Sequence, residues 1–149
     1  MDALNFPTYA FKVRVEGDQK QIFDEIRKKY IALTPEEWVR QHMVKYLTKE
    51  KKYPSSLFAI ETGLKYNKLR KRTDLVVYKR DGRPLLLVEC KAPGVTINEQ
   101  PFNQIASYNK ELQSKYLIVT NGISHYCCEI DYSNGKLKFL DNIPTYSDD

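Results

Sequence analysis

The strongest constraint on the fold is an Asp-Gly step between two apolar runs. The first run is Thr73-Asp-Leu-Val-Val-Tyr78, and the second is Leu85-Leu-Leu-Val-Glu-Cys-Lys91. Asp81 and Gly82 lie between them, and Asp-Gly is favoured in type I′ turns because both central residues need positive φ. The pattern therefore predicts a β-hairpin over residues 73–91 that is closed by a two-residue turn.

The predicted turn decides which residues of the hairpin face each other. With that turn, Arg80 faces Arg83 at the tip. Further along the strands, Asp74 lies directly opposite Glu89, with Cβ atoms about 4.5–5.5 Å apart. Two carboxylates at that separation repel, and a hard cation such as Mg²⁺ relieves the repulsion by accepting oxygen from both. Lys91 shares the face of Glu89, where it can steady an attacking water or the developing charge on phosphorus.

Two alternatives to this pairing stay open at the level of the sequence. A three-residue loop would shift the pairing by one residue and would put the two acids on opposite faces. The hairpin can also be an ordinary surface element whose strands end in solvated charges. Spacing alone gives this second alternative about the same weight as a metal site.

The composition indicates one folded domain, residues 1–149, with 42% apolar residues and a net charge of +5. A basic chain suits a polyanionic partner such as nucleic acid, although many soluble domains are mildly basic. No run approaches the ~18 apolar residues of a membrane span, so we expect no membrane association. Three cysteines without CxxC spacing suit a reducing cytoplasm, and together with only two histidines they argue against zinc. No Gly-x-x-x-x-Gly-Lys-Ser/Thr loop is present, so we expect no ATP-driven motor on this sequence.

The remaining periodicities predict a mixture of strands and helices. Strands are expected at 8–15, 21–23, 57–66, 116–120, 123–130 and 137–140, and helices at 34–48 and 98–114. Over residues 34–130 the order is α–β–β–β–α–β–β, and the strand–helix–strand unit around 85–120 favours a parallel pair. We divide the chain into an N-terminal strand hairpin and lead-in (1–30), a core (31–130), and a C-terminal hairpin strand and tail (131–149).

Thr34-Pro-Glu-Glu37 has the pattern of a helix start. Thr34 suits the N-cap, and Glu37 suits the N3 position of a capping box, where its carboxylate reaches back to the N-cap amide. Glu36 has no such task and lies one turn ahead of Arg40 on the same face. We therefore expect Glu36, rather than Glu37, to be an additional acid of the carboxylate cluster.

Two further groups of polar residues accompany the hairpin. Gln104 and Tyr108 are spaced i and i+4 on the expected helix 98–114, where both can reach a backbone or phosphate, although such a pair is usually a solvated rim. A basic run also precedes Asp74; it consists of Lys65, Lys68, Arg70, Lys71 and Arg72. This run is equally compatible with a solvated segment and with contacts to phosphates.

Five blocks of the sequence together resemble the PD-(D/E)xK nuclease superfamily, and most of all the N-terminal nuclease domain of type I restriction enzyme R subunits. They are Thr34-Pro-Glu-Glu-Trp-Val-Arg40, Arg72-Thr-Asp-Leu-Val-Val-Tyr78, Pro84-Leu-Leu-Leu-Val-Glu-Cys-Lys-Ala-Pro93, Gln104-Ile-Ala-Ser-Tyr108 and Tyr116-Leu-Ile-Val-Thr-Asn-Gly122. An Asp/Glu-x-Lys motif alone is a weak signal, whereas five blocks in the family's order are a strong one. One departure is Thr73, which stands where the superfamily's name has proline.

The resemblance implies an α/β fold with a restriction-endonuclease-like core, in which helices flank a mixed β-sheet. It implies that Asp74 and Glu89 ligate Mg²⁺, with Mn²⁺ as a substitute, and that Lys91 assists the attacking water. Glu36 would hold a second ion or the water shell of the metal. Gln104 and Tyr108 would shape the site or touch DNA.

We therefore expect a cytoplasmic, Mg²⁺-dependent endonuclease of the restriction type that acts on DNA. In the R subunits this domain is attached to an ATP-driven motor and depends on partner subunits, so a motor or specificity protein is an expected partner. The alternative is a non-catalytic nucleic-acid-binding module, or a nuclease subunit that needs a motor partner. The oligomeric state is open.

Overall fold

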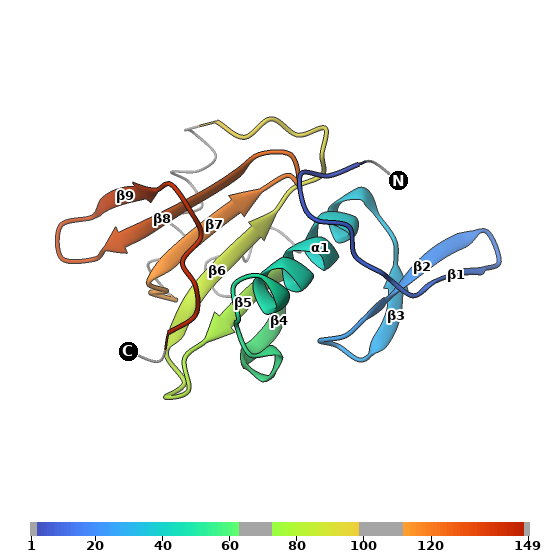
Figure 1. Cartoon of the computed structure of the whole chain (residues 1–149), viewed down its shortest axis with the longest axis horizontal. Helices are drawn as coiled ribbons and strands as arrows, with labels where there is room; N and C mark the ends of the chain where they lie inside the picture. Colours follow the sequence, from blue (N-terminus) through green and yellow to red (C-terminus); the bar gives the residue numbers. More distant parts are fainter. Residues whose placement is uncertain (1–2, 63–72, 99–111, 148–149) are drawn as a thin grey trace.

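A computed structural model describes residues 3–62, 73–98 and 112–147, and only the backbone of residues 61, 62, 73 and 74. The strands form two sheets, a small one of three strands near the N-terminus and a larger one of six strands (Figure 1). A single helix of the described ranges, α1, lies across one face of the larger sheet. The molecule is therefore a mixed α/β domain. Within the described residues no helix has the length and apolar character needed to cross a bilayer.

The larger sheet has the strand order β4-β5-β6-β7-β8-β9. Its strands are β4 (Phe58–Thr62), β5 (Thr73–Tyr78), β6 (Pro84–Cys90), β7 (Tyr116–Thr120), β8 (His125–Asp131) and β9 (Lys136–Leu140), and a 3₁₀ turn, η1 (Ser55–Leu57), precedes β4. β6 and β7 run parallel, and all other neighbours in this sheet are antiparallel. The predicted mixed sheet and its parallel pair are confirmed. The helix predicted over 98–114 falls almost wholly outside the described residues.

α1 (Pro35–Lys49) begins where the sequence predicts. Thr34 has an extended backbone, and its hydroxyl accepts a hydrogen bond from the Glu37 amide at 3.0 Å. Pro35 occupies the first turn, where its missing N–H costs no helical hydrogen bond. The apolar side chains that the helix buries are Val39, Met43, Val44 and Leu47.

The two faces of the six-stranded sheet carry separate apolar clusters. The face under α1 presents side chains of β5 and β6, namely Leu75, Val77, Leu86, Val88 and Cys90. The other face presents Val76, Leu87, Leu117, Val119 and Cys128. Because the core strands are covered on both faces, β6 is a continuous apolar run rather than an alternating one.

The hairpin between β5 and β6 differs from the predicted two-residue turn. Lys79 N donates to Arg83 O at 2.7 Å, and Gly82 N donates to Lys79 O at 2.9 Å. Residues 80–82 therefore form a three-residue loop, and Arg80 does not face Arg83. Gly82 closes the loop with φ of +89°, as in hairpins that combine a type I turn with a left-handed glycine.

A β-bulge nevertheless restores the predicted register. Tyr78 pairs with Pro84, but the next residue, Val77, pairs with Leu86. Leu85 is therefore an extra residue in β6, and it is buried in the same apolar cluster as its neighbour Leu86. A bulge interrupts the alternation of side chains in this way, and here it compensates for the shift that the three-residue loop introduces.

The small sheet consists of β1 (Val13–Glu16), β2 (Gln19–Asp24) and β3 (Lys29–Ala32), all antiparallel. The sequence predicts the first two strands, with different bounds, and misses β3. β3 has four residues with a weak polar–apolar contrast, so periodicity does not distinguish it from a loop. In Figure 1 this sheet stands beside α1, away from the strands of the larger sheet.

The other two predicted hairpins are present. Asn121 and Gly122 lie in the connection between β7 and β8, where the Asn121 side-chain oxygen accepts from the amides of Ile123 and Ser124 at 2.9 and 2.8 Å. The connection between β8 and β9 contains Gly135 with φ of +71°.

Candidate functional site

The strongest candidate site lies at the end of β6. The Glu89 side chain is 3% exposed, the Lys91 side chain is 23% exposed, and Lys91 Nζ lies 3.3 Å from Glu89 Oε1. Lys91 N donates to Thr120 O at 2.8 Å, which extends the parallel pairing of β6 with β7 beyond the strand end. The two side chains therefore lie together, in agreement with the prediction that Glu89 and Lys91 share a face. A buried carboxylate that faces an ammonium at a strand end is costly to desolvate, which makes the pair a candidate for a functional role.

Asp74 lies on β5, the neighbour of β6 in the sheet. The ladder of β5 with β6 runs as far as Leu75 opposite Val88, so the predicted pairing of Asp74 with Glu89 is one residue beyond it and stays a prediction. On its other side Asp74 pairs with Glu61 of β4. The side chains of Asp74 and Glu61 lie outside the described part of the chain, so a contact between their carboxylates and Glu89 stays a prediction.

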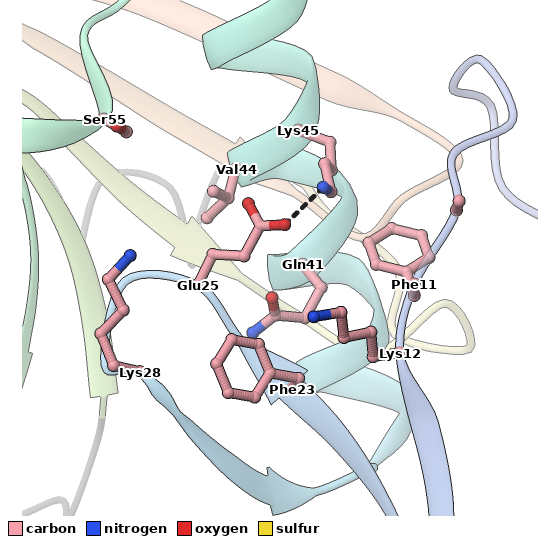
Figure 2. A pocket seen from close by; sticks show the side chains of 10 residues that line it. Phe11, Lys12, Phe23, Glu25, Lys28, Gln41, Val44, Lys45 and Ser55 are labelled. Atoms are coloured by element: carbon pink, nitrogen blue, oxygen red, sulfur yellow. Dashed lines mark hydrogen bonds and ion pairs between the residues drawn. The ribbon is translucent and has the colours of Figure 1, made fainter.

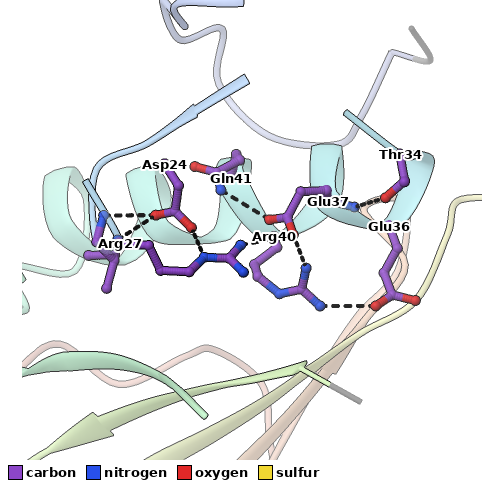
Figure 3. Close-up of polar contacts among 8 residues, drawn as sticks. Asp24, Arg27, Thr34, Glu36, Glu37, Arg40 and Gln41 are labelled. Carbon is purple, nitrogen blue, oxygen red and sulfur yellow. Dashed lines mark hydrogen bonds and ion pairs between the residues drawn. The ribbon is translucent and has the colours of Figure 1, made fainter. Parts of the chain in front are cut away.

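A second cluster of charges lies at the start of α1 (Figure 3). Arg40 is 4% exposed in its side chain; its Nη1 donates to Glu37 Oε1 at 2.6 Å and its Nη2 to Glu36 Oε1 at 2.9 Å. Glu37 also accepts from Arg27 Nη2 at 3.0 Å and from Gln41 Nε2 at 3.0 Å. The carboxylate of Glu37 thus takes part in a buried ion-pair network. The expected structural role holds, but through these partners rather than through the N-cap amide.

The network continues into the small sheet. Asp24 is fully buried and accepts from Arg27 Nε at 2.5 Å. It also accepts from the amides of Ile26 and Arg27 at 2.8 and 3.1 Å, which closes the turn after β2. Because Arg27 binds both Asp24 and Glu37, this turn is fastened to the first turn of α1.

Among the described residues, the charged groups of this network are three carboxylates and two guanidiniums. They belong to Asp24, Glu36 and Glu37 and to Arg27 and Arg40. Glu36 is the solvent-facing end, with its side chain 44% exposed.

Arg40 also approaches the underside of β6, where Cys90 lies. Burial raises the pKa of the Cys90 thiol to about 12, so the thiol is neutral near pH 7. Burial acts to lower the pKa of Arg40, but the charges around it outweigh this effect and raise its pKa above the ordinary value. Because Cys90 is neutral, the carboxylates of Glu37 and Glu36 are the partners that keep Arg40 charged.

The described contacts join Glu36 to Arg40 and Glu89 to Lys91, and the charges of Glu36, Arg40 and Glu89 all act on Cys90 at the end of β6. α1 covers the face of the sheet that carries Val88 and Cys90, whereas Glu89 alternates with them and lies on the other face. Among the described side chains, no three of the His, Cys, Asp or Glu type form a metal-binding group. Asp74 is not in that set, so the metal-binding roles of Asp74, Glu89 and Glu36 stay predictions.

The other predicted site residues lie outside the described residues. They are Lys65, Lys68, Arg70, Lys71 and Arg72 of the basic run, and Gln104 and Tyr108 of the expected second helix. Their places relative to Glu89 are open.

Sequence reasoning missed three features of the site region. Glu61 of β4 pairs with Asp74 of β5, and the only sequence feature that could have indicated this pairing is the extended pattern of residues 57–66. Asp24 and Arg27 join the network of α1 from a separate sheet, and no local spacing indicates this contact. Asn121, 7% exposed, donates to Val95 O at 2.8 Å and so ties the loops after β6 and β7 together beside Lys91.

These features define a mixed α/β domain that presents an acid–lysine pair at the end of a central parallel strand. Comparison with known families places the domain more narrowly. The chain belongs to the family of the type I restriction enzyme R protein N terminus, whose model matches residues 35–144. No curated protein matches the chain, and no solved structure does. The family indicates a restriction-related role, and it covers the Glu89–Lys91 pair, the Asp74 strand and α1.

Proposed function

We propose that this domain is a Mg²⁺-dependent endonuclease that hydrolyses phosphodiester bonds in DNA, with a PD-(D/E)xK, restriction-endonuclease-like core. The observation that carries the proposal is the buried Glu89 carboxylate with Lys91 Nζ 3.3 Å away. Asp74 is on the neighbouring strand, one residue beyond the pair of Leu75 with Val88, and it would lie opposite Glu89 if the ladder continued. Membership of a restriction enzyme family supports the reaction class and DNA as the substrate.

The donors at this position fit a hard divalent cation. Glu89 supplies carboxylate oxygens, and Asp74 would supply two more from the neighbouring strand; such oxygens are the ligands that Mg²⁺ prefers. Mn²⁺ accepts the same ligands and would substitute. When bound, the ion would supply a Lewis acid to the scissile phosphate.

Lys91 would act on the reacting oxygens. Its ammonium is partly withdrawn from solvent and is oriented by Glu89, so it can donate a hydrogen bond to a water or to a phosphoryl oxygen. A donor that is already in place needs no reorganisation when charge develops on the phosphate. Glu36 would hold a second ion or its water shell.

The remaining predicted residues would serve the substrate. Gln104 and Tyr108 would support the site, and the basic run 65–72 would contact DNA phosphates, which fix position without reading sequence. Cleavage would require partner subunits of the motor or specificity kind, as the family indicates.

A cleavage assay with the substitutions Asp74→Ala and Lys91→Ala tests the assignment. Each change should reduce cleavage by about 100-fold or more, since each removes a group that acts on the reacting atoms. Lys136→Ala is a matched control, because Lys136 is exposed on β9, which is separated from β6 by β7 and β8 in the sheet. Wild-type DNA affinity and circular dichroism in both test variants would show that only the chemistry is lost. Cleavage at the wild-type rate by either test variant would refute the assignment.

A metal titration distinguishes the enzyme from a non-catalytic nucleic-acid-binding module. The enzyme should show a rise in melting temperature with millimolar Mg²⁺ or Mn²⁺, and Asp74→Ala should abolish it. If DNA binds but neither ion changes the melting temperature, the result would favour the binding module, which the basic composition of the chain also suits. The assays should include single-stranded, double-stranded and branched DNA, with and without an added motor subunit.

A further inference from the structure

A cavity of about 470 Å³ lies where the N-terminal segment, the small sheet and α1 meet (Figure 2). Its walls come from the segment before β1, from Phe23 of β2, from the turn after β2, and from Gln41, Val44 and Lys45 of α1. This volume is within the range of about 300–1,000 Å³ that is usual for small-molecule sites. None of its walls includes Glu89, Lys91 or Glu36, so the cavity is separate from the proposed cleavage site.

The cavity carries a net positive charge. Lys12, Lys28 and Lys45 line it together with one carboxylate, Glu25. Lys45 Nζ lies 2.7 Å from Glu25 Oε1, so that pair is neutral as a whole. Lys12 and Lys28 are exposed and have no carboxylate partner among the described residues. Two positive charges therefore remain for an anionic ligand.

Two aromatic rings accompany these charges. Phe11 and Phe23 are both partly exposed and both line the cavity. Lys12 Nζ lies 5.4 Å from the centre of the Phe23 ring, and Lys45 Nζ lies 5.9 Å from the centre of the Phe11 ring. An ammonium beside an aromatic ring suits a ligand that joins an anionic group to a flat, apolar one.

Gln41 adds a fixed polar group to the wall. It is 4% exposed, and its Nε2 donates to Glu37 Oε2 at 3.0 Å, which orients the amide. With Nε2 engaged in this way, the amide oxygen is the atom of Gln41 that can accept a hydrogen bond from a ligand. An acceptor held in this manner suits the N–H groups at the edge of a nucleobase.

We propose that this cavity binds a nucleotide, with the phosphate at Lys12 or at Lys28, which lie on either side of Phe23 in Figure 2, and the base against Phe11 or Phe23 and the Gln41 amide. The same chemistry is present in a free mononucleotide and in an unpaired nucleotide of a strand. A bare divalent cation does not fit, because the cavity has a single carboxylate that is already paired with Lys45. Binding here does not depend on the proposed cleavage.

The lone tryptophan provides the readout. Trp38 packs against Phe11 with ring centres 5.2 Å apart, so a base that contacts Phe11 should change its fluorescence. The titration uses the whole chain with EDTA present, so that no cleavage occurs and the result is independent of the proposed nuclease activity. The probes are deoxyadenosine monophosphate, a short single-stranded oligonucleotide, inorganic phosphate and an oligoglutamate peptide.

The double variant Lys12→Gln/Lys28→Gln should bind the nucleotide probe about tenfold more weakly, because whichever of the two lysines contacts the phosphate is lost. Lys20→Gln/Lys29→Gln is the matched control: it removes the same charge from exposed lysines of the small sheet that do not line the cavity. The control should bind like the wild type. Phe23→Leu should weaken the mononucleotide but leave any binding of inorganic phosphate unchanged.

Each result decides the proposal. Binding of both nucleotide probes, weakened in the double variant, supports a site for free nucleotides; binding of the oligonucleotide alone, weakened in the same way, supports a site for an unpaired nucleotide of a strand. The proposal is overturned if neither nucleotide probe binds, or if phosphate or oligoglutamate binds as tightly as the mononucleotide. Equal weakening in the Lys20/Lys29 control would also overturn it, since the effect would then be general charge.

Discussion

At the scale of single residues, Arg40 is the side chain on which the acids of α1 depend. Its guanidinium is almost completely buried and binds both Glu36 and Glu37. Removal of one member of a buried ion pair leaves an uncompensated charge, and this costs more than the pair itself contributes. Arg40 therefore controls both the stability of the network and the position of Glu36.

The substitution Arg40→Met should destabilise the protein by about 3–5 kcal/mol, because Glu37 loses its shortest ion-pair contact while it stays buried. Urea unfolding monitored by circular dichroism measures this change. Arg83→Met is the control, since Arg83 forms an exposed ion pair with Asp81 at the hairpin tip. Arg83→Met should leave the unfolding midpoint nearly unchanged. Equal midpoints for the two variants would contradict a structural role for Arg40.

The sequence supports correct predictions at this scale where the chemistry is local. Glu89 and Lys91 share a face because they are two residues apart in the extended chain at the end of β6, and Thr34 caps α1 because hydroxyl residues favour that place. The partners of Glu37 could not be predicted, because Arg27 comes from a turn in another sheet. Ion pairs between residues far apart in the sequence depend on how the helices and strands pack, and the spacing of residues along the chain does not indicate that packing.

At the scale of elements, the hairpin of β5 and β6 shows how a correct register can follow from an incorrect turn. Asp81-Gly82 indicates a hairpin, and a hairpin is present, but the loop has three residues and Leu85 forms a bulge. Turn types with two and three residues use similar residues, so composition does not separate them. The predicted pairing of the two strands is nevertheless correct, because Val77 and Leu86 must both face the core to be buried.

A series of glycine substitutions tests the turns. Gly82→Ala should cost about 1–2 kcal/mol, because φ is +89° and a left-handed backbone disfavours a Cβ, although nothing lies within 4 Å of it. Gly122→Ala should cost more, because its φ is +86° and a Cβ would also lie 2.7 Å from Leu4 Cδ2. The melting temperatures of the two variants test this order: Gly122→Ala should melt at a lower temperature than Gly82→Ala.

Gly94→Ala is the control for this series. Gly94 has no positive φ, and a Cβ there would meet nothing within 4 Å. The change should therefore be neutral or slightly stabilising. A loss at Gly94 as large as that at Gly82 would show that backbone conformation is not the cause.

At the scale of the whole molecule, the N-terminal segment fastens the far side of α1 to the loop between β7 and β8. Asn5 N donates to Gly122 O at 2.7 Å, and His125 Nε2 donates to Asn5 O at 2.9 Å. The Phe6 ring lies between two imidazoles, with centres 4.4 Å from His125 and 5.9 Å from His42. The segment is thus held by two histidines from different elements.

Stability should consequently fall as the solution becomes acidic. Burial lowers the pKa of His42 and of His125 below the usual value, despite hydrogen bonds to carbonyl oxygens that act to raise it. The unfolded chain then binds protons more readily than the folded one, so stability is fully present above about pH 6.5 and is lost as pH falls through the lowered pKa values.

Thermal melts between about pH 7.5 and pH 5 measure this effect, in a range above the usual carboxylate pKa values. The melting temperature should decrease with acid in the wild type. His125→Gln keeps a donor for the Asn5 carbonyl but cannot titrate, so its melting temperature should depend less on pH. A wild-type melting temperature that is constant or that rises toward pH 5 would contradict the prediction.

The bulge at Leu85 has a consequence for how this domain tolerates change. A two-residue turn with a regular ladder and a three-residue loop with a bulge use the same number of residues between Val77 and Leu86. Both kinds of turn give the same pairing of Leu75 with Val88. The residues of the turn can therefore change without a shift between the strands that carry Asp74 and Glu89. We therefore expect natural variation and engineered tags to be accepted at residues 79–83 and rejected between Leu86 and Lys91, where one added residue would turn Glu89 toward α1.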